Sequence, residues 1–205
     1  MLTGKSHKAP TLLRRKRLLL SLLLAEFLLV PGWSWALETM DTPVELQIKL
    51  LVQASTYDRN QKNKPPPGVL RIGVIHTEST DSQKVADEIM GQFAEKHMTV
   101  RKYELQLESI TFKDASNLKE ATRSRNIHMY YIAPGNRNNL STIIDLGKEM
   151  KIMTMTGVAD YVYAGTTIGV QNNGSRPQFL YNQQSAEENA ADFDANFLRM
   201  VKFVK

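Results

Sequence analysis

The chain has 205 residues, 42% of them hydrophobic, which suits one domain with its own core. Its formal net charge is +5, but residues 1–36 hold six of the 26 basic side chains and one of the 21 acidic ones, so the remainder holds 20 of each. Binding to nucleic acid needs a surplus of basic side chains facing phosphates, and we therefore expect no nucleic-acid partner. The chain has no cysteine, which excludes disulfides and thiolate chemistry.

Residues 1–36 contain, in order, the parts of a cleavable signal peptide. The basic block Arg14–Arg17 precedes an apolar run over residues 18–30, and small residues follow, ending at Ala36. The alternative interpretation is a membrane anchor, but a helix over this run is only ~20 Å long, against a hydrocarbon core of ~30 Å. We therefore expect secretion, cleavage after Ala36 and a periplasmic protein whose single domain spans residues 37–205.

The rest of the chain alternates between strand-like and helix-like segments. Thr42-Pro43 is a start signal for a helix over residues 44–56, and the proline-rich residues 65–68 form a stiff connector. Short apolar or alternating runs predict four strands, and helical spacing with capping residues predicts three helices between them. The predicted strands cover residues 69–75, 99–107, 127–133 and 151–156, and the predicted helices cover residues 83–96, 116–125 and 139–151.

This alternation predicts an α/β fold with a mostly parallel sheet flanked by helices, in a Rossmann-like three-layer arrangement, because right-handed crossovers join parallel strands economically. Beyond the fourth strand, residues 161–170 and 178–181 flank the turn sequence Asn172-Asn173-Gly174-Ser175, which predicts a C-terminal β-hairpin. Apolar residues at helical spacing within residues 185–205 predict a terminal amphipathic helix. They are Phe193, Phe197, Leu198, Val201 and Val204.

Four residues of the C-terminal third, Gly165, Ile168, Asn182 and Leu198, match a known family pattern. The pattern is a glycine before the fifth strand, Ile or Val within it, Asn at the end of the hairpin and a Leu-rich final helix. On this basis residues 44–204 resemble the YfiR-like family of periplasmic proteins. The matched residues determine the fold, so the resemblance implies the architecture more directly than it implies an activity.

In the best-understood branch of that family, the periplasmic protein binds the sensory domain of an inner-membrane diguanylate cyclase. It thereby lowers cyclic-di-GMP signalling. The resemblance therefore implies a membrane-bound sensor or signalling protein as the partner. That branch uses cysteines for structure and redox response, and this chain has none, so redox sensing is not implied.

Two loops are candidate sites because they follow predicted strands, where sites in α/β proteins assemble. The first holds His76, Thr77 and Ser79, with His76 as a general base or ligand; the alternative is a histidine at a loop edge. No two histidines stand at i, i+4, no serine lies in a Gly-x-Ser-x-Gly motif, and the glycine-rich nucleotide motifs are absent. We therefore expect no metal, no cofactor and no enzymatic activity.

The second candidate loop is Gly135, Asn136, Arg137 and Asn138, between the third strand and the helix after it. Its backbone N–H groups and the Arg137 guanidinium could hold an anion at the N-terminus of that helix. The alternative is an ordinary turn with capping residues. This loop is the best sequence candidate for a small-ligand site.

Two functions are therefore considered in detail, with a hydrolase as the least favoured third. A regulator that docks on a membrane sensor needs an exposed apolar patch, and a small-ligand module serving a transporter or sensor needs a pocket at the strand ends. A homodimer remains open as well. The candidates for the patch are Leu50, Leu51, Tyr161, Tyr163 and Phe179.

Overall fold

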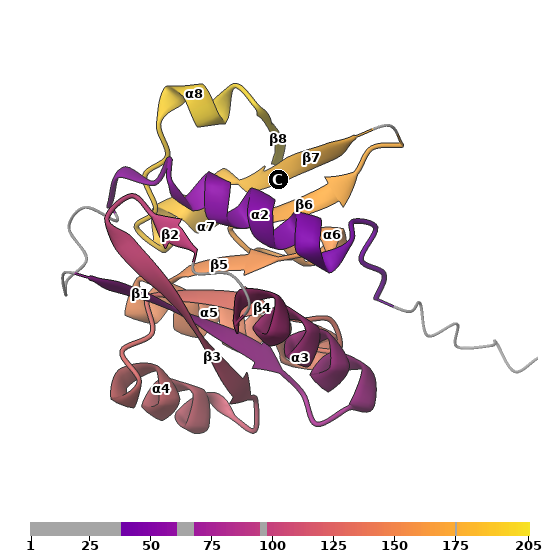
Figure 1. The fold of residues 1–205 in the computed structure, drawn as a ribbon, viewed down its shortest axis with the longest axis vertical. Coiled ribbons are helices and arrows are strands. Elements are labelled where there is room, and N and C mark those ends of the chain that lie inside the picture. The colour runs from indigo at the N-terminus through magenta and orange to yellow at the C-terminus, as the bar shows by residue number, and fades with distance from the viewer. Residues whose placement is uncertain (1–37, 61–67, 95–97, 175) are drawn as a thin grey trace, which may run out of the picture. The chain divides into compact units, whose positions relative to one another are not determined.

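The computed structural model describes residues 38–60, 68–94, 98–174 and 176–205 (Figure 1). Residues 38–205 belong to one compact unit. The predicted signal peptide and its cleavage point after Ala36 lie outside the described residues, as does most of the proline-rich connector.

An eight-stranded sheet lies at the centre of this unit, in the order β2-β3-β1-β4-β5-β6-β7-β8. Neighbouring strands from β3 to β6 run parallel, as do β7 and β8, while β2 pairs with β3 and β7 with β6 in antiparallel fashion. This arrangement confirms the predicted mostly parallel α/β sheet and its hairpin. The strands are β1 Val69–His76, β2 Thr99–Val100, β3 Tyr103–Thr111, β4 Met129–Ile132, β5 Met153–Thr156, β6 Ile168–Asn172, β7 Pro177–Asn182 and β8 Val201–Val204.

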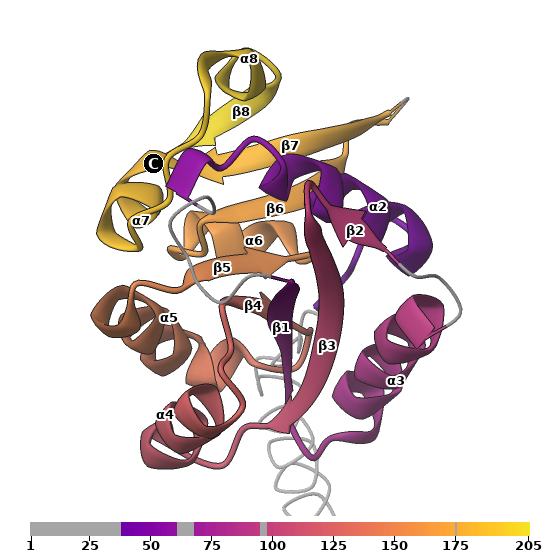
Figure 2. The same ribbon diagram turned by 60° about the vertical axis from the view of Figure 1, so that its left-hand side comes forward.

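Helices cover both faces of the sheet and give the three layers seen in Figure 2. On one side α2 and α3 pack over one apolar cluster, and on the other α4 and α5 pack over a second. The buried strand β4 serves both, since Met129 and Tyr131 belong to the first cluster and Tyr130 and Ile132 to the second. The helices are α2 Val44–Ser55, α3 Thr80–Ala94, α4 Ala115–Ser124, the 3-10 turn η2 Arg137–Asn139, α5 Leu140–Met150, α6 Ala159–Tyr163, α7 Gln183–Glu188 and α8 Ala195–Leu198.

Two predicted strands differ from the structure by more than one or two residues at an end. The predicted strand over residues 99–107 is divided at Arg101, whose φ is 54°, into the short β2 and a longer β3 that pairs with β1 along its length. Tyr161, predicted to begin a strand, lies instead in α6, and Gly165 with a φ of +119° follows that helix before β6. Helices commonly end at a residue with a positive φ, and glycine adopts this conformation without steric strain.

The prediction of a terminal helix is wrong. The helix α8 has only four residues, where Asp194 accepts hydrogen bonds from the N–H groups of Asn196 and Phe197, and the chain then forms β8 beside β7. The open side of β7 offers unpaired backbone groups, and the β-branched Val201 and Val204 favour a strand that satisfies them. That opportunity depends on tertiary structure and is invisible in the local spacing.

Candidate functional site

The strand order reverses between β1 and β4. After β1 the chain moves to β3 on one side and then returns to β4 on the other side of β1. In open α/β sheets, ligands bind at the carboxyl ends of the strands at such a switch point. The two candidate loops predicted from the sequence begin at these two strand ends, so the fold brings them together.

His76, the last residue of β1, is 5% exposed. Its Nδ1 lies 3.0 Å from the carbonyl oxygen of Thr77, and its Nε2 lies 3.0 Å from Oγ of Ser109 on β3. Because a carbonyl oxygen can only accept, Nδ1 donates to it, while Nε2 and the Ser109 hydroxyl lie within hydrogen-bond distance of each other. Both ring nitrogens are therefore engaged in holding strand ends together. Among the described residues no group of three His, Asp or Glu side chains could hold a metal ion.

Side chains close the loop after β1. The N–H of Thr77 donates to Oγ of Ser82 at 3.1 Å, and the hydroxyl oxygens of Thr77 and Ser79 lie 2.9 Å apart. Gly135 of the second loop packs directly on this one, since a Cβ added there would lie 3.3 Å from Oγ of Ser79 and 2.9 Å from Cβ of Ser82 in the first turn of α3. The two predicted candidate loops are thus in contact at the switch point.

Asn136 fixes the second loop from inside the protein. It is fully buried, and its Nδ2 donates to the carbonyl oxygens of Ala133 at 2.9 Å and of Ile75 at 3.1 Å. Its backbone N–H donates to the hydroxyl oxygen of Tyr161 at 2.9 Å, so this amide is not offered to an anion. Asn138 is exposed in η2. Of the four predicted residues, Gly135 and Arg137 direct backbone N–H groups at one common point, the Glu38 carboxylate.

The carboxylate of Glu38 lies at the loop for which the sequence predicts a bound anion. It accepts hydrogen bonds from the N–H groups of Gly135 and Arg137, the latter at 3.2 Å, and from the hydroxyl of Tyr161. Nε of Arg137 lies 3.5 Å from its Oε1, and Nη2 of Arg137 lies 3.2 Å from Oδ2 of Asp160. We call Gly135, Arg137 and Tyr161 the carboxylate site. The sequence predicts this loop as a candidate site, but it gives no sign of Glu38, because 97 positions separate Glu38 from Gly135.

Tyr161 is 1% exposed, and its pKa is held well above the usual value of 10. Burial is the main cause, and the hydrogen bond and negative charge of Glu38 add to it. The hydroxyl therefore stays protonated and donates to the Glu38 carboxylate while it accepts from the N–H of Asn136.

The predicted partner surface is wrong for two of its five residues, because Leu51 and Tyr161 lie in the core with exposures of 2% and 1%. Both occur in segments whose helical packing turns them inward. Leu50 and Phe179 are half-buried, and Tyr163 is exposed. These five residues do not form one exposed patch.

Other exposed apolar side chains lie at the edge strand β8. Met200 and Phe203 are 48% and 50% exposed, and the Phe203 ring packs edge-on against Tyr181 with centroids 5.5 Å apart. On the opposite face of β8, Nζ of Lys202 lies 3.1 Å from the hydroxyl oxygen of Tyr163. A groove beside this edge includes Met200, Phe179 and two arginines, Arg176 and Arg199.

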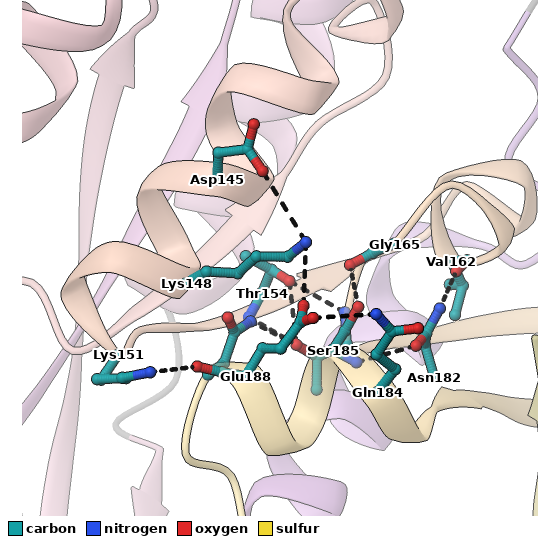
Figure 3. Close-up of polar contacts among 12 residues, drawn as sticks. Asp145, Lys148, Lys151, Thr154, Val162, Gly165, Asn182, Gln184, Ser185 and Glu188 are labelled. Carbon is teal, nitrogen blue, oxygen red and sulfur yellow. Dashed lines mark hydrogen bonds and ion pairs between the residues drawn. The ribbon is translucent and has the colours of Figure 1, made fainter.

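Two of the residues that carried the family resemblance, Gly165 and Asn182, hold a corner of the fold (Figure 3). Nδ2 of Asn182 donates to the carbonyl oxygen of Val162 at 3.2 Å, and its Oδ1 caps α7 by accepting from the N–H of Ser185. The Ser185 hydroxyl donates to the carbonyl oxygen of Gly165, and Ile168 is fully buried beside them. These contacts tie the hairpin to α6 and α7 and supply no reactive group.

Solved structures share the fold at low sequence identity. The ABC domain in complex with L-Trp from Streptococcus pneumonia has a TM-score of 0.56 and 12% identity, over 80% of this chain and 62% of that chain. A conserved domain protein from Vibrio cholerae has the same TM-score and identity, over 80% of this chain and 60% of that chain. The chain thus spans about three fifths of these relatives, and the likeness shows the fold alone. No curated protein sequence matches the chain.

Within the described residues, no helix has the length and apolar character needed to span a membrane. A family model described as YfiR/HmsC-like matches residues 45–202 of the chain. This range includes β1 to β7 and all the helices between them, together with Gly165, Ile168, Asn182 and Leu198. The match covers well over half of the chain, and the protein therefore belongs to the YfiR/HmsC-like family.

Proposed function

We propose that this protein is a non-enzymatic periplasmic regulator that binds the periplasmic part of a membrane-bound sensor and restrains it. The observation that carries the proposal is the YfiR/HmsC-like match over residues 45–202. The resemblance noted from the sequence implies a diguanylate cyclase, or a similar sensor, as the target. The signal-peptide pattern of residues 1–36 supports export to the compartment in which that sensory part would lie.

The edge strand β8 is our candidate for the docking surface. It is the last strand of the sheet, and no described residue pairs with its outer side. An edge strand can bind an extended segment through its free N–H and C=O groups. Phe203 and Met200 supply apolar contacts there, and Arg176 and Arg199 line the adjoining groove. We therefore expect the sensor to contribute an extended segment that carries apolar and acidic side chains.

Co-expression of the full chain with each membrane-bound diguanylate cyclase of its own genome tests this function. The wild-type chain should lower cellular cyclic-di-GMP with one of them. Phe203→Glu should abolish the effect, whereas Leu46→Glu, which changes a side chain 37% exposed on α2, should keep it. Unchanged cyclic-di-GMP with every cyclase would overturn a diguanylate cyclase as the target, and equal effects of both variants would remove β8 from the docking surface.

A second candidate function is a small-ligand (anion) binding module that serves a transporter or sensor. The specific observation in its favour is the contact between the loops of Gly135 and Ser79 at the switch point of the sheet, where α/β proteins bind ligands. A ligand that binds only the folded protein raises its melting temperature. Arg137→Ala should reduce that stabilisation, and equal stabilisation of both forms would exclude Arg137.

A further inference from the structure

The carboxylate site is organised by contacts that do not involve its occupant. Two hydrogen bonds from the Asn136 side chain tie the loop to Ala133 and Ile75, and the N–H of Asn136 orients the Tyr161 hydroxyl. Gly135 is packed on the loop after β1. The donors are therefore already in place for an anion that arrives from outside, and little ordering is needed on binding.

The arrangement of donors suits a carboxylate in particular. Oε2 of Glu38 accepts from the N–H of Gly135 and the hydroxyl of Tyr161, while Oε1 accepts from the N–H of Arg137 and lies near its Nε. Oε2 thus receives two hydrogen bonds, and Oε1 receives one hydrogen bond and an ion-pair contact. Asp160 shares the Arg137 guanidinium, so the charge available for a ligand is small. A planar monoanion fits this set better than a doubly charged phosphate with a third oxygen to satisfy.

Glu38 lies in a segment that is held at few points. Residues 38–43 form no helix or strand, and Thr39 and Asp41 are exposed. Of the first four described residues, 38–41, Glu38 and Met40 contact the rest of the protein, and Met40 is partly buried against the core. If the leader is removed after Ala36 as predicted, Glu38 becomes the second residue of the mature chain, where fraying costs least.

We propose that the carboxylate site binds the carboxylate of a small organic acid, and that Glu38 covers the site as an internal competitor. This rests on the second function above and adds to it the class of ligand and the contact that controls access. A docked Glu38 lowers the fraction of molecules that can bind a free acid, and the apparent Kd rises in proportion. Removal of the Glu38 carboxylate should therefore tighten binding.

Acetate is the appropriate probe, because it is the fragment that Glu38→Ala removes from the site. The purified wild-type and Glu38→Ala chains are titrated with sodium acetate, and the backbone amide signals of Gly135 and Arg137 are followed by 1H–15N NMR. Both signals should shift saturably in Glu38→Ala. If Glu38 is docked in about nine of ten wild-type molecules, the acetate Kd of the variant should be about tenfold lower than that of the wild type.

Two further variants and two further salts make the test specific. Glu38→Ala with Arg137→Ala should lose the response, and Glu38→Ala with Arg125→Ala, at an exposed arginine beside Glu108, should keep it. Sodium chloride at equal ionic strength should give no saturable shift. Equal Kd values for wild type and Glu38→Ala, or no saturable shift with acetate, would overturn the proposal. If phosphate alone saturates the site, the carboxylate class is wrong and the ligand-binding function stands; if neither anion does, both fail.

Discussion

The carboxylate of Glu38 accepts a hydrogen bond from the hydroxyl of Tyr161, 123 positions further along the chain. The same carboxylate accepts from two backbone N–H groups, and its side chain is only 12% exposed. A hydrogen bond to a charged group contributes about 1.5–3 kcal/mol, and this contact links the first described segment to the carboxyl end of the sheet.

Glu38→Ala should therefore lower the free energy of unfolding by about 1–3 kcal/mol in urea denaturation at neutral pH. The matched control is Glu45→Ala, which removes an exposed i, i+4 ion pair with Lys49 and should cost no more than about 0.5 kcal/mol. Equal midpoints for Glu38→Ala and the wild type would show that the contact contributes nothing to stability.

Buried tyrosines predict a loss of stability at alkaline pH. Burial raises the pKa of Tyr130 and of Tyr181 to about 12, from an ordinary value of 10.0, and raises those of Tyr131 and Tyr161 further. A pKa that is raised in the folded state leaves stability unaffected below the unfolded value and lowers it as the pH rises toward the folded value. The unfolding free energy should thus fall between about pH 10 and pH 12, while absorbance at 295 nm in the folded protein lags behind that of urea-unfolded chains.

Within the C-terminal segment, truncation of Phe197 should lower the free energy of unfolding the most. Its fully buried ring packs on Phe193, Phe179 and Tyr57, with centroids 4.7, 5.3 and 5.5 Å away. Phe197→Ala should cost about 3–5 kcal/mol in urea denaturation. Phe203→Ala, at a half-exposed ring, is the control and should cost much less; similar midpoints for the two variants would contradict this assignment of the core.

Leu198→Ala should have a smaller effect than Phe197→Ala, because Leu198 is only partly buried against the core. The helical spacing of the sequence predicts Leu198 on the buried face of a terminal helix, where its truncation would unfold much of the protein. In the structure, with its short α8, Phe197 is the fully buried side chain instead of Leu198. A greater loss of stability in Leu198→Ala than in Phe197→Ala would contradict this order.

Gly157 and Gly91 should respond in opposite directions to alanine. A Cβ at Gly157 would collide with the side chain of Gln47, which is fully buried, donates to the carbonyl oxygen of Thr42 and accepts from the hydroxyl of Tyr131. Gly157→Ala should therefore destabilise the protein by about 1–3 kcal/mol. Gly91 lies within α3 with nothing near its Cβ position, so Gly91→Ala should stabilise by up to about 1 kcal/mol. Thermal unfolding of the two variants checks both signs.

Cleavage of the predicted signal peptide should give the mature protein a single, defined N-terminus. Mass spectrometry of the protein recovered from the periplasm should show a chain that begins at Leu37, because the small residues before it fit the signal peptidase. Recovery of chains that begin at Met1 in the membrane fraction would contradict cleavage. This measurement also decides whether Glu38 is the second residue of the functional protein.

The sequence alone determined the alternation of strands and helices from β1 to β5 and the places of the two candidate loops. Each predicted strand is a short run with its own periodicity, and a parallel sheet necessarily collects the loops after its strands at one edge. The alternation of strands and helices is therefore enough to expect His76 and Gly135 near one another. The sequence also predicts the helix of residues 44–56, since Pro43 gives a start signal just before its apolar pattern.

Only the tertiary structure decided what is buried, paired or occupied. Val201 and Val204 form a strand because β7 has an open side, and Tyr161 is internal because α6 packs against the sheet. Glu38 fills the carboxylate site although nothing near it in sequence marks it as a ligand. Local patterns record the preferences of neighbouring residues, whereas these three outcomes depend on groups far apart in the chain that become partners only when the sheet is assembled.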